Sequence, residues 1–272
     1  MGTMMHRYSA ILLVLLTGLL LLSCDRQQQV TSTAETAPVP QYEGTIIAIG
    51  DSLTAGLGVA EAAAWPSLLE QKLREKGHNL QVINAGISGE TSSGTLSRIK
   101  WIMARKPDIV ILETGANDGL RGVDPAVTEK NIAEILTVLK RENITVVLAG
   151  MKMVVNMGKT YTDTFEKIYP ALAERFDVML IPFFLDGVAA IPSLNGPDGI
   201  HPNAAGYKVL VRNIFPYVTD AIELWRKTSS GTATRKNKAA AFSTVGYGER
   251  FRSLSADYSI KRSIFSQSAL CY

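Results

Sequence analysis

The sequence predicts an α/β fold in which helices cover both faces of a parallel β-sheet. Short apolar runs alternate with amphipathic stretches from Thr45 to Trp225. Each run is apolar through most of its length, which is typical of parallel strands buried on both faces. With 272 residues, 46% of them hydrophobic, the chain is long enough to bury the core of one such domain.

Strands and helices are expected in alternating order. The expected strands are Thr45–Gly50, Leu80–Ala85, Asp108–Glu113, Thr145–Gly150 and Val178–Phe183. Apolar residues recur at a spacing near 3.6 in the expected helices, which are Trp65–Lys76, Thr95–Lys106, Pro125–Glu142, Thr162–Phe176 and Asn203–Trp225. Pro125 in the first turn, after Asp124 as N-cap, supports the start of the third helix. We therefore place the folded domain at residues 44–226.

The N-terminus has the pattern of a secretory signal. The apolar run Ala10–Leu22 follows Arg7 and is too short to span a bilayer comfortably. Its end, Leu21–Cys24, resembles the lipobox of bacterial lipoproteins. This implies a signal peptide over residues 1–23, a lipid on Cys24 and a periplasm-facing protein anchored to a membrane of the bacterial cell envelope. The alternative is an ordinary cleaved signal and a soluble periplasmic or secreted protein.

Two segments beside the domain lack the periodicity of folded structure. Residues 24–43 are rich in Gln, Thr, Ala and Pro, which indicates a flexible tether. Residues 227–272 combine small, hydroxyl and basic side chains, and we expect a disordered tail. Once Cys24 carries a lipid, only Cys271 remains as a thiol, so no intrachain disulfide is expected.

The formal charge of +3 is unevenly distributed along the chain. From Arg226 onward, nine Lys and Arg stand against two Asp and Glu, a surplus of seven, so the preceding residues carry −4. A domain with a net negative charge lacks the basic surface that nucleic-acid binding usually needs. We therefore expect no nucleic-acid partner.

Candidate site residues should directly follow strands, because ligands of parallel sheets gather beyond the carboxyl ends of the strands. Ser52 follows the first strand within Gly50-Asp51-Ser52 and is a candidate nucleophile; the alternative is a serine that only caps a helix. A serine hydroxyl needs an adjacent base to become a nucleophile. Since His6 lies in the signal and His78 in a polar turn, His201 is the candidate base.

The remaining parts of an acyl-transfer site are found in other loops. Asp198 precedes His201 by three residues, a spacing that can bring its carboxylate to the imidazole and select the tautomer; the alternative is that Asp198 caps the next helix. Acyl transfer also needs hydrogen-bond donors for the developing oxyanion. Asn84–Thr91 offers a backbone N–H beside a glycine, and Gly115–Gly119 offers the Asn117 amide.

Four ordered blocks together resemble the SGNH, or GDSL, hydrolase family. They are Gly50-Asp51-Ser52-Leu53, Asn84 to Gly89, Gly115-x-Asn117-Asp118 and Asp198-x-x-His201, over about Thr45 to Trp225. Within the family the chain is most similar to the bacterial thioesterase I/lysophospholipase type, on the segments Ala63–Pro66, Ile87–Thr91, Asn117–Gly122 and Asp198–Pro202.

The resemblance implies a flavodoxin-like three-layer α/β/α sandwich with a five-stranded parallel sheet. It assigns Ser52 as nucleophile, His201 as general base and then acid, and Asp198 as the residue that orients His201. The implied oxyanion donors are the backbone N–H groups of Ser52 and Gly89 and the Asn117 side chain. Gly86 is the rival of Gly89, and Ala116 departs from the glycine that similar members often carry there. No cofactor is implied, and Asp, Glu and His show no metal-ligand spacing.

The expected activity is hydrolysis of small-molecule or lipid esters or thioesters through an acyl-enzyme, as in acyl-CoA thioesterases, lysophospholipases or arylesterases. A carbohydrate O-acetylesterase of the cell envelope is an alternative, and a non-catalytic binding lipoprotein is an alternative of another class. The loop Lys152–Tyr161 is expected to flank the acyl pocket. Its apolar residues either line that pocket or belong to the core; they are Met151, Met153, Val154, Val155 and Met157. We expect a monomer.

Overall fold

The computed structural model describes residues 41–153 and 157–230, and the helices and strands of these ranges lie in the unit Tyr42–Tyr272. Five strands form one parallel sheet in the order β2-β1-β3-β4-β5. They are β1 (Gly44–Gly50), β2 (Leu80–Gly86), β3 (Ile109–Glu113), β4 (Thr145–Ala149) and β5 (Met179–Ile181). The predicted five-stranded parallel α/β fold is thereby confirmed.

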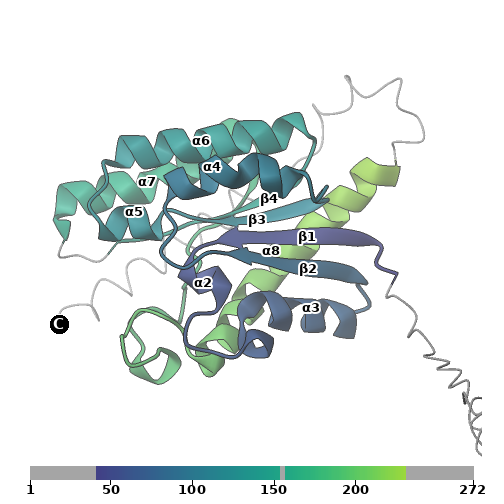
Figure 1. The fold of residues 1–272 in the computed structure, drawn as a ribbon, viewed down its shortest axis with the longest axis horizontal. Helices are drawn as coiled ribbons and strands as arrows, with labels where there is room; N and C mark the ends of the chain where they lie inside the picture. Colours follow the sequence, from purple (N-terminus) through teal and green to yellow (C-terminus); the bar gives the residue numbers. More distant parts are fainter. Residues whose placement is uncertain (1–40, 154–156, 231–272) are drawn as a thin grey trace, which may run out of the picture. The chain divides into compact units, whose positions relative to one another are not determined.

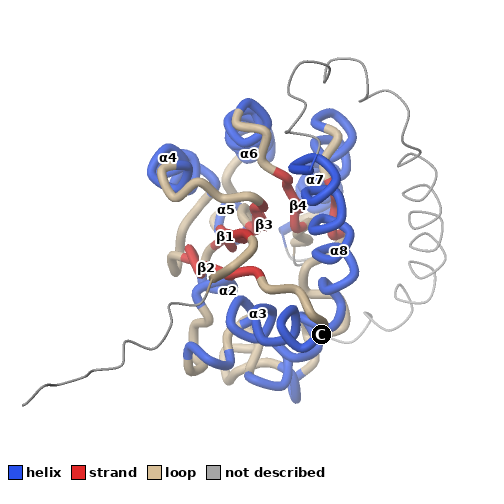
Figure 2. Tube along the Cα trace, turned by 90° about the vertical axis from the view of Figure 1, so that its right-hand side faces the viewer, coloured by secondary structure: helices blue, strands red, loops and turns tan. Residues whose placement is uncertain are grey.

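Helices cover both faces of this sheet, as Figures 1 and 2 show. The long helices α4 (Ser92–Met103), α6 (Pro125–Arg141) and α7 (Lys159–Phe176) pack side by side on one face, and α3 (Trp65–Glu75) and α8 (Ala204–Ser230) on the other. Short helices complete the loops: α2 (Ser52–Ala55), α5 (Ala116–Leu120) and the 3-10 turns Glu61–Ala63 and Pro192–Leu194. Within the described ranges, no helix is both long and apolar enough to cross a bilayer.

The core lies between the sheet and its two helical layers. Strands β3 and β4 are buried along their whole length, and so is nearly all of β1, which explains their continuous apolar sequence. Trp65 of α3 is fully buried and meets the Phe184 ring edge-on, with ring centroids 5.6 Å apart. The Tyr207 hydroxyl of α8 donates to the Leu53 carbonyl at 2.8 Å and so attaches the short helix α2 to the core.

Element ends differ from the expected ones for local reasons. Helix α4 begins at Ser92, three residues before the expected Thr95, because the Thr91 hydroxyl accepts the Gly94 N–H and caps the helix. Strand β5 ends at Ile181, before Pro182, which has no N–H to donate to a ladder. Helix α8 continues to Ser230, four residues beyond the expected domain end at 226.

Strand β2 forms one rim of the sheet, and side chains of the flanking helices bind its backbone. Glu70 of α3 accepts the Val82 N–H at 2.8 Å, and Arg98 of α4 donates to the Ala85 carbonyl at 2.7 Å. Both helices that flank this rim therefore also bind its backbone.

Several expectations fall outside the described residues. These are the signal peptide 1–23, the lipid on Cys24, residues 24–40 of the tether, Val154 and Val155 of the acyl loop, and the tail from residue 231.

Candidate active site

The loops after β1, β2 and β3 meet where the strand order changes direction, since the chain passes from β1 outward to β2 and then crosses to β3. This is the place where doubly wound sheets bind ligands. Ser52 follows β1 and Asn117 follows β3, so these two lie on either side of the change in direction.

Ser52 is the first residue of helix α2. The cap of this helix is Asp51, whose carboxylate accepts the Leu53 N–H at 2.9 Å, so the alternative that Ser52 serves as the cap is wrong. Ser52 is 9% exposed, and its hydroxyl oxygen lies 2.8 Å from Nε2 of His201. The hydroxyl is therefore held at an imidazole from a loop 149 residues later in the chain.

Asp198 binds His201 at two places. Its Oδ2 lies 2.6 Å from the ring Nδ1, and its Oδ1 accepts the backbone N–H groups of Ile200 and His201 at 2.9 and 3.0 Å. The His201 backbone N–H, the His201 ring and the Ile200 N–H hold the pKa of Asp198 well below its ordinary value. An ionised Asp198 favours the proton on Nδ1 and leaves Nε2 free to accept one from Ser52.

The next helix does not use Asp198 as its cap. Asn203 stands before α8, and its side-chain oxygen accepts the N–H groups of Ala205 and Gly206 at 2.9 and 3.0 Å. The alternative capping function of Asp198 is therefore wrong, and its carboxylate serves His201 and the turn that carries it.

The family resemblance predicts two backbone oxyanion donors, the N–H groups of Ser52 and Gly89. In the part of the chain that the structure describes, neither Ser52 nor Gly89 donates its N–H to a protein acceptor. Gly89 has a φ of +77°, a conformation that glycine adopts without strain. By contrast, the rival Gly86 donates its N–H to the Asn84 side chain at 2.9 Å, and a Cβ at Gly86 would collide with the backbone of α2.

The Asn117 amide is already engaged in the resting protein. Its Nδ2 donates to Asp51 Oδ2 at 2.9 Å and to the Glu90 carbonyl at 3.1 Å. A ligand oxyanion must therefore compete with the longer of these bonds, a feature that sequence reasoning missed.

Beneath the turn that carries Ser52 lies Glu113, a fully buried carboxyl at the end of β3. Its Oε2 accepts the Asp51 N–H at 3.0 Å and the Thr54 hydroxyl at 2.8 Å, whereas Oε1 has no hydrogen-bond partner within the described residues. Burial and then the nearby Asp51 raise the pKa of Glu113 well above its ordinary value. Gly50 is needed here because a Cβ would collide with Thr54 and Glu113.

We expect the stability of Glu113→Gln, relative to the unchanged protein, to rise with pH. Because the pKa of Glu113 is raised in the folded protein, the unfolded chain releases this proton at a lower pH, near the ordinary pKa of 4.5. As pH rises above that value, the wild type should lose up to about 1.4 kcal/mol of unfolding free energy per pH unit, and the glutamine variant should not. Urea unfolding at several values between pH 5 and 8 measures this difference; a pH-independent gap would contradict a raised pKa of Glu113.

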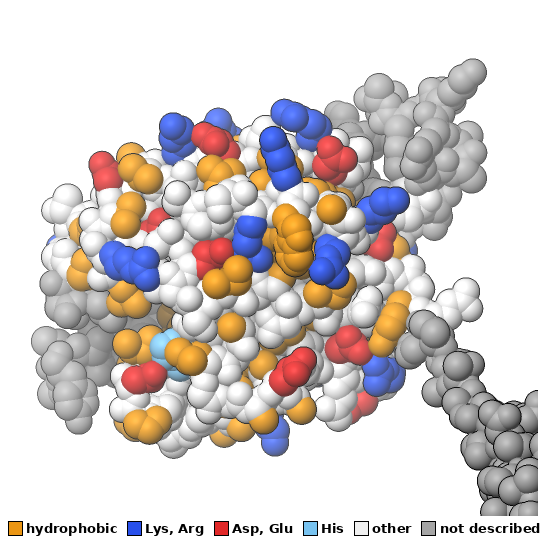
Figure 3. All heavy atoms as spheres, viewed as in Figure 1, with side chains coloured by type: hydrophobic (Ala, Val, Ile, Leu, Met, Phe, Trp, Pro, Cys, Tyr) orange, Lys and Arg blue, Asp and Glu red, His pale blue; other side chains and the backbone are white. Residues whose placement is uncertain are grey.

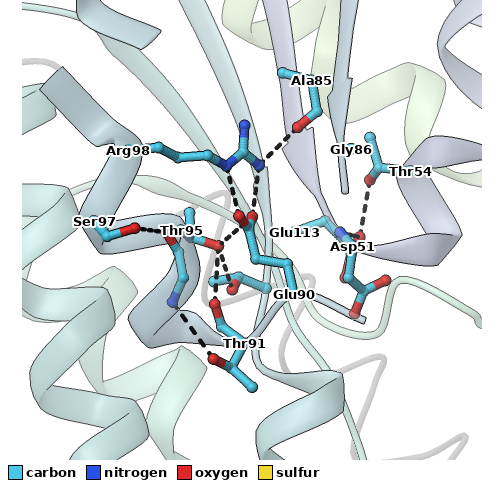
Figure 4. A network of polar contacts seen from close by, with 12 residues as sticks. Asp51, Thr54, Ala85, Gly86, Glu90, Thr91, Thr95, Ser97, Arg98 and Glu113 are labelled. Carbon is cyan, nitrogen blue, oxygen red and sulfur yellow. Dashed lines mark hydrogen bonds and ion pairs between the residues drawn. The ribbon is translucent and has the colours of Figure 1, made fainter. Parts of the chain in front are cut away.

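The loop that carries Gly89 is held by an ion pair, which Figure 4 shows from close by. Arg98 of α4 donates from Nε and Nη2 to the two carboxylate oxygens of Glu90, at 2.7 and 2.6 Å, and from Nη2 to the Ala85 carbonyl. The side chains of Arg98 and Glu90 are only 14% and 7% exposed. Since Ala85 precedes the loop and Glu90 follows Gly89, this pair closes the loop at both ends.

Replacing Arg98 by Met is expected to lower the free energy of unfolding by about 3–5 kcal/mol, because Glu90 would remain buried without its counter-charge. Arg74→Met is the matched control: Arg74 pairs with Glu70 at 2.7 Å, but its side chain is 62% exposed, and such pairs contribute about 1 kcal/mol or less. Urea unfolding measures the loss of unfolding free energy in each variant. Equal losses would show that the buried Arg98–Glu90 pair stabilises the fold no more than the exposed Arg74–Glu70 pair does.

Asp118, next to Asn117, joins the third block to the second. Its carboxylate accepts the backbone N–H of Ser92, at 2.7 Å, and the Ser92 hydroxyl, while Thr128 of α6 also donates to it at 3.3 Å. Asp118 is buried, and the N-terminal end of α4 supplies the positive pole that stabilises its charge.

The apolar residues after β4 divide between core and surface. Met151 is buried in the core, and Met153 packs directly on Gly119 of α5, where a Cβ would require the Met153 side chain to move. Met157 is partly exposed near Gly122. Core packing therefore applies to Met151, while Met153 lies against the helix that carries Asn117.

Ser52, His201 and Asp198 form a hydrogen-bonded series beyond the carboxyl ends of a parallel sheet. This arrangement is characteristic of serine hydrolases. The chain belongs to the GDSL-like Lipase/Acylhydrolase family, which it matches over residues 48–209. This confirms the predicted SGNH/GDSL family.

Named relatives are esterases and related acyl hydrolases. Esterase TesA of Pseudomonas aeruginosa is 38% identical over 173 residues, which are 63% of this chain and 86% of that protein. Thioesterase 1/protease 1/lysophospholipase L1 of Escherichia coli K12 is 40% identical over 177 residues, 65% of this chain and 80% of that protein. The crystal structure of AlinE4, an SGNH-hydrolase family esterase, is 41% identical, has a TM-score of 0.57 and covers 67% of this chain and 98% of its own. The protein is a serine esterase of the SGNH class.

Proposed function

We propose that the esterase works by two-step acyl transfer at Ser52. Nε2 of His201 takes the hydroxyl proton as the Ser52 oxygen attacks the carbonyl carbon of an ester or thioester. The same proton then passes from His201 to the departing alcohol or thiol, and Ser52 is left acylated. Water activated by His201 attacks the acyl group and releases the acid and the free serine. The observation that carries the proposal is the series Ser52–His201–Asp198, with contacts of 2.8 and 2.6 Å.

Three donors would stabilise the oxyanion in each tetrahedral intermediate. Two are the N–H groups of Ser52 and Gly89, which have no protein acceptor among the described residues. The third is the Asn117 amide, which would turn one hydrogen from the Glu90 carbonyl to the oxyanion, while its bond to Asp51 keeps the side chain in place. Gly86 is less suited because its N–H is bound by Asn84.

The substrate class we propose is acyl esters and thioesters with hydrocarbon chains, including lysophospholipids and acyl-CoA. Support comes from the names of the relatives, one of which is a thioesterase and lysophospholipase. A fluorophosphonate probe should label the protein, and mass spectrometry of the digest should place the label on the Ser52 peptide. Hydrolysis rates over p-nitrophenyl esters from two to sixteen carbons, and over lysophospholipid and acyl-CoA, then rank the substrates. Labelling elsewhere, or none, would overturn the mechanism; hydrolysis of acetylated sugars alone would overturn the substrate class.

We also propose that the mature protein is a monomer that begins at a lipidated Cys24 and faces the periplasm. The motif Leu21–Cys24 supports this start. Mass spectrometry of the N-terminal peptide from a bacterial host should show a diacylglycerol-type mass increase on Cys24, absent from Cys24→Ser. An unmodified cysteine, or a start further along the chain, would contradict the anchor, and light scattering in detergent would test the monomer.

A further inference from the structure

Although the residues before Arg226 carry a net negative charge, one segment among them is strongly basic. Residues 92–106, which form helix α4 and the turn after it, contain Arg98, Lys100, Arg105 and Lys106 and no Asp or Glu. The flanking acids face inward: Glu90 is bound by Arg98, and Asp108 accepts from the Thr45 backbone and the Trp225 ring. The positive charges of Lys100, Arg105 and Lys106 are therefore left uncompensated by these flanking acids.

A large aromatic side chain lies in the middle of this basic segment. Trp101 is 58% exposed, although tryptophan is usually largely buried, and the Arg105 guanidinium lies 4.9 Å from its ring centroid. Figure 3 shows hydrophobic side chains between Lys and Arg side chains across the middle of this face. An exposed tryptophan among basic side chains is the composition of a segment that binds at the boundary between water and lipid.

Beside Trp101 the surface is hollowed between α4 and the rim strand β2. The groove has a volume of about 270 Å³ and is lined by apolar side chains of β2 and α4, together with Arg98 and Arg105. Ile87 also lines it, is 49% exposed, and lies two residues before Gly89. The apolar and basic surface therefore extends from α4 to the loop beside Ser52.

We propose that this face, made of Lys100, Trp101, Arg105, Lys106 and the adjoining groove, binds the surface of an anionic lipid bilayer. The positive charge of this face favours an anionic bilayer as the partner, because each basic side chain near the headgroup layer is attracted to the negatively charged lipids. Trp101 and Ile87 enter the boundary region, and the guanidinium and ammonium groups contact lipid phosphates. The bilayer then lies next to the loop that carries Gly89.

The test uses the full chain and vesicles of phosphatidylglycerol and tail-brominated phosphatidylcholine in equal parts. Of the three tryptophans, Trp65 is buried and Trp225 half-buried, and Trp101→Phe supplies the background signal to be subtracted. Bromine on the acyl chains should quench Trp101 fluorescence, and vesicles without phosphatidylglycerol should quench it much less. Because the readout is local to residue 101, binding through either end of the chain does not mimic it.

A triple variant, Lys100→Gln, Arg105→Gln and Lys106→Gln, should lower the lipid affinity measured by this quenching about 100-fold, at roughly fivefold per charge. The matched control carries Lys167→Gln, Lys208→Gln and Arg212→Gln, which remove the same charge from exposed positions on α7 and α8. The control should bind as the wild type does, and both variants should keep their activity on a short soluble ester. Measuring the quenching in Ser52→Ala as well separates this surface from the catalytic proposal.

Vesicle binding without Trp101 quenching would overturn the proposal, and so would equal loss in the two triple variants. A Trp101 response to single-stranded DNA or to an acidic protein, with no response to vesicles, would also overturn it.

Discussion

Replacing Ser52 by alanine should lower kcat by about 10⁵- to 10⁶-fold and abolish fluorophosphonate labelling, because within residues 41–153 and 157–230 no other hydroxyl binds the His201 imidazole. The fold should survive. The helix cap is the Asp51 carboxylate, and the one hydrogen bond of the Ser52 hydroxyl to a described residue is that with His201.

Ser97→Ala is the matched control, since Ser97 is exposed on α4 and its hydroxyl binds only the Gly94 carbonyl. Initial rates on a p-nitrophenyl ester and circular dichroism should be recorded for both variants. Turnover by Ser52→Ala above about one hundredth of the wild-type rate would eliminate the serine mechanism.

Replacing Asn117 by alanine should lower kcat by about 10²- to 10³-fold with little change in KM, because the amide is proposed to bind charge that exists only in the transition state. The rate of fluorophosphonate inactivation should fall in parallel, since that reaction also places negative charge on the oxygen that faces these donors. Asn213→Ala, which removes only a bond to the Asp186 carbonyl on the surface, should leave both rates unchanged.

A loss confined to KM would assign Asn117 to substrate binding instead. A fall in kcat accompanied by a loss of several kcal/mol of unfolding free energy would indicate that the bonds to Asp51 and Glu90 matter mainly for the fold. Urea unfolding of Asn117→Ala therefore belongs in the same experiment.

The long, periodic elements were predictable from the sequence because burial dictates their residue types. All five strands and the five long helices were expected within a few residues of their positions. The two short helices were not. Helix α2 has four residues and α5 has five, too few for a period of 3.6, and they are held by contacts from distant residues such as the bond from Tyr207 to Leu53.

The residues of the candidate site also fall into two groups, those that the sequence indicated and those that it did not. Ser52, Asp198, His201 and Asn117 were identified because each stands in a loop with a recognisable pattern. Glu113 and Arg98 were missed, since a carboxyl at the end of an apolar strand and an arginine in an amphipathic helix carry no local signal. Their importance depends on which side chains the fold brings to them, namely the Asp51 turn for Glu113 and Glu90 for Arg98.

The bond from the Val82 N–H to the Glu70 carboxylate has a consequence for solubility. A bare strand at the border of a sheet is a template on which another copy of the chain can build further β-structure. Glu70 occupies an outward N–H of this border strand, so variants at position 70 should show a tendency to aggregate during expression. A single carboxylate on the neighbouring helix thus protects the sheet from pairing with a second chain.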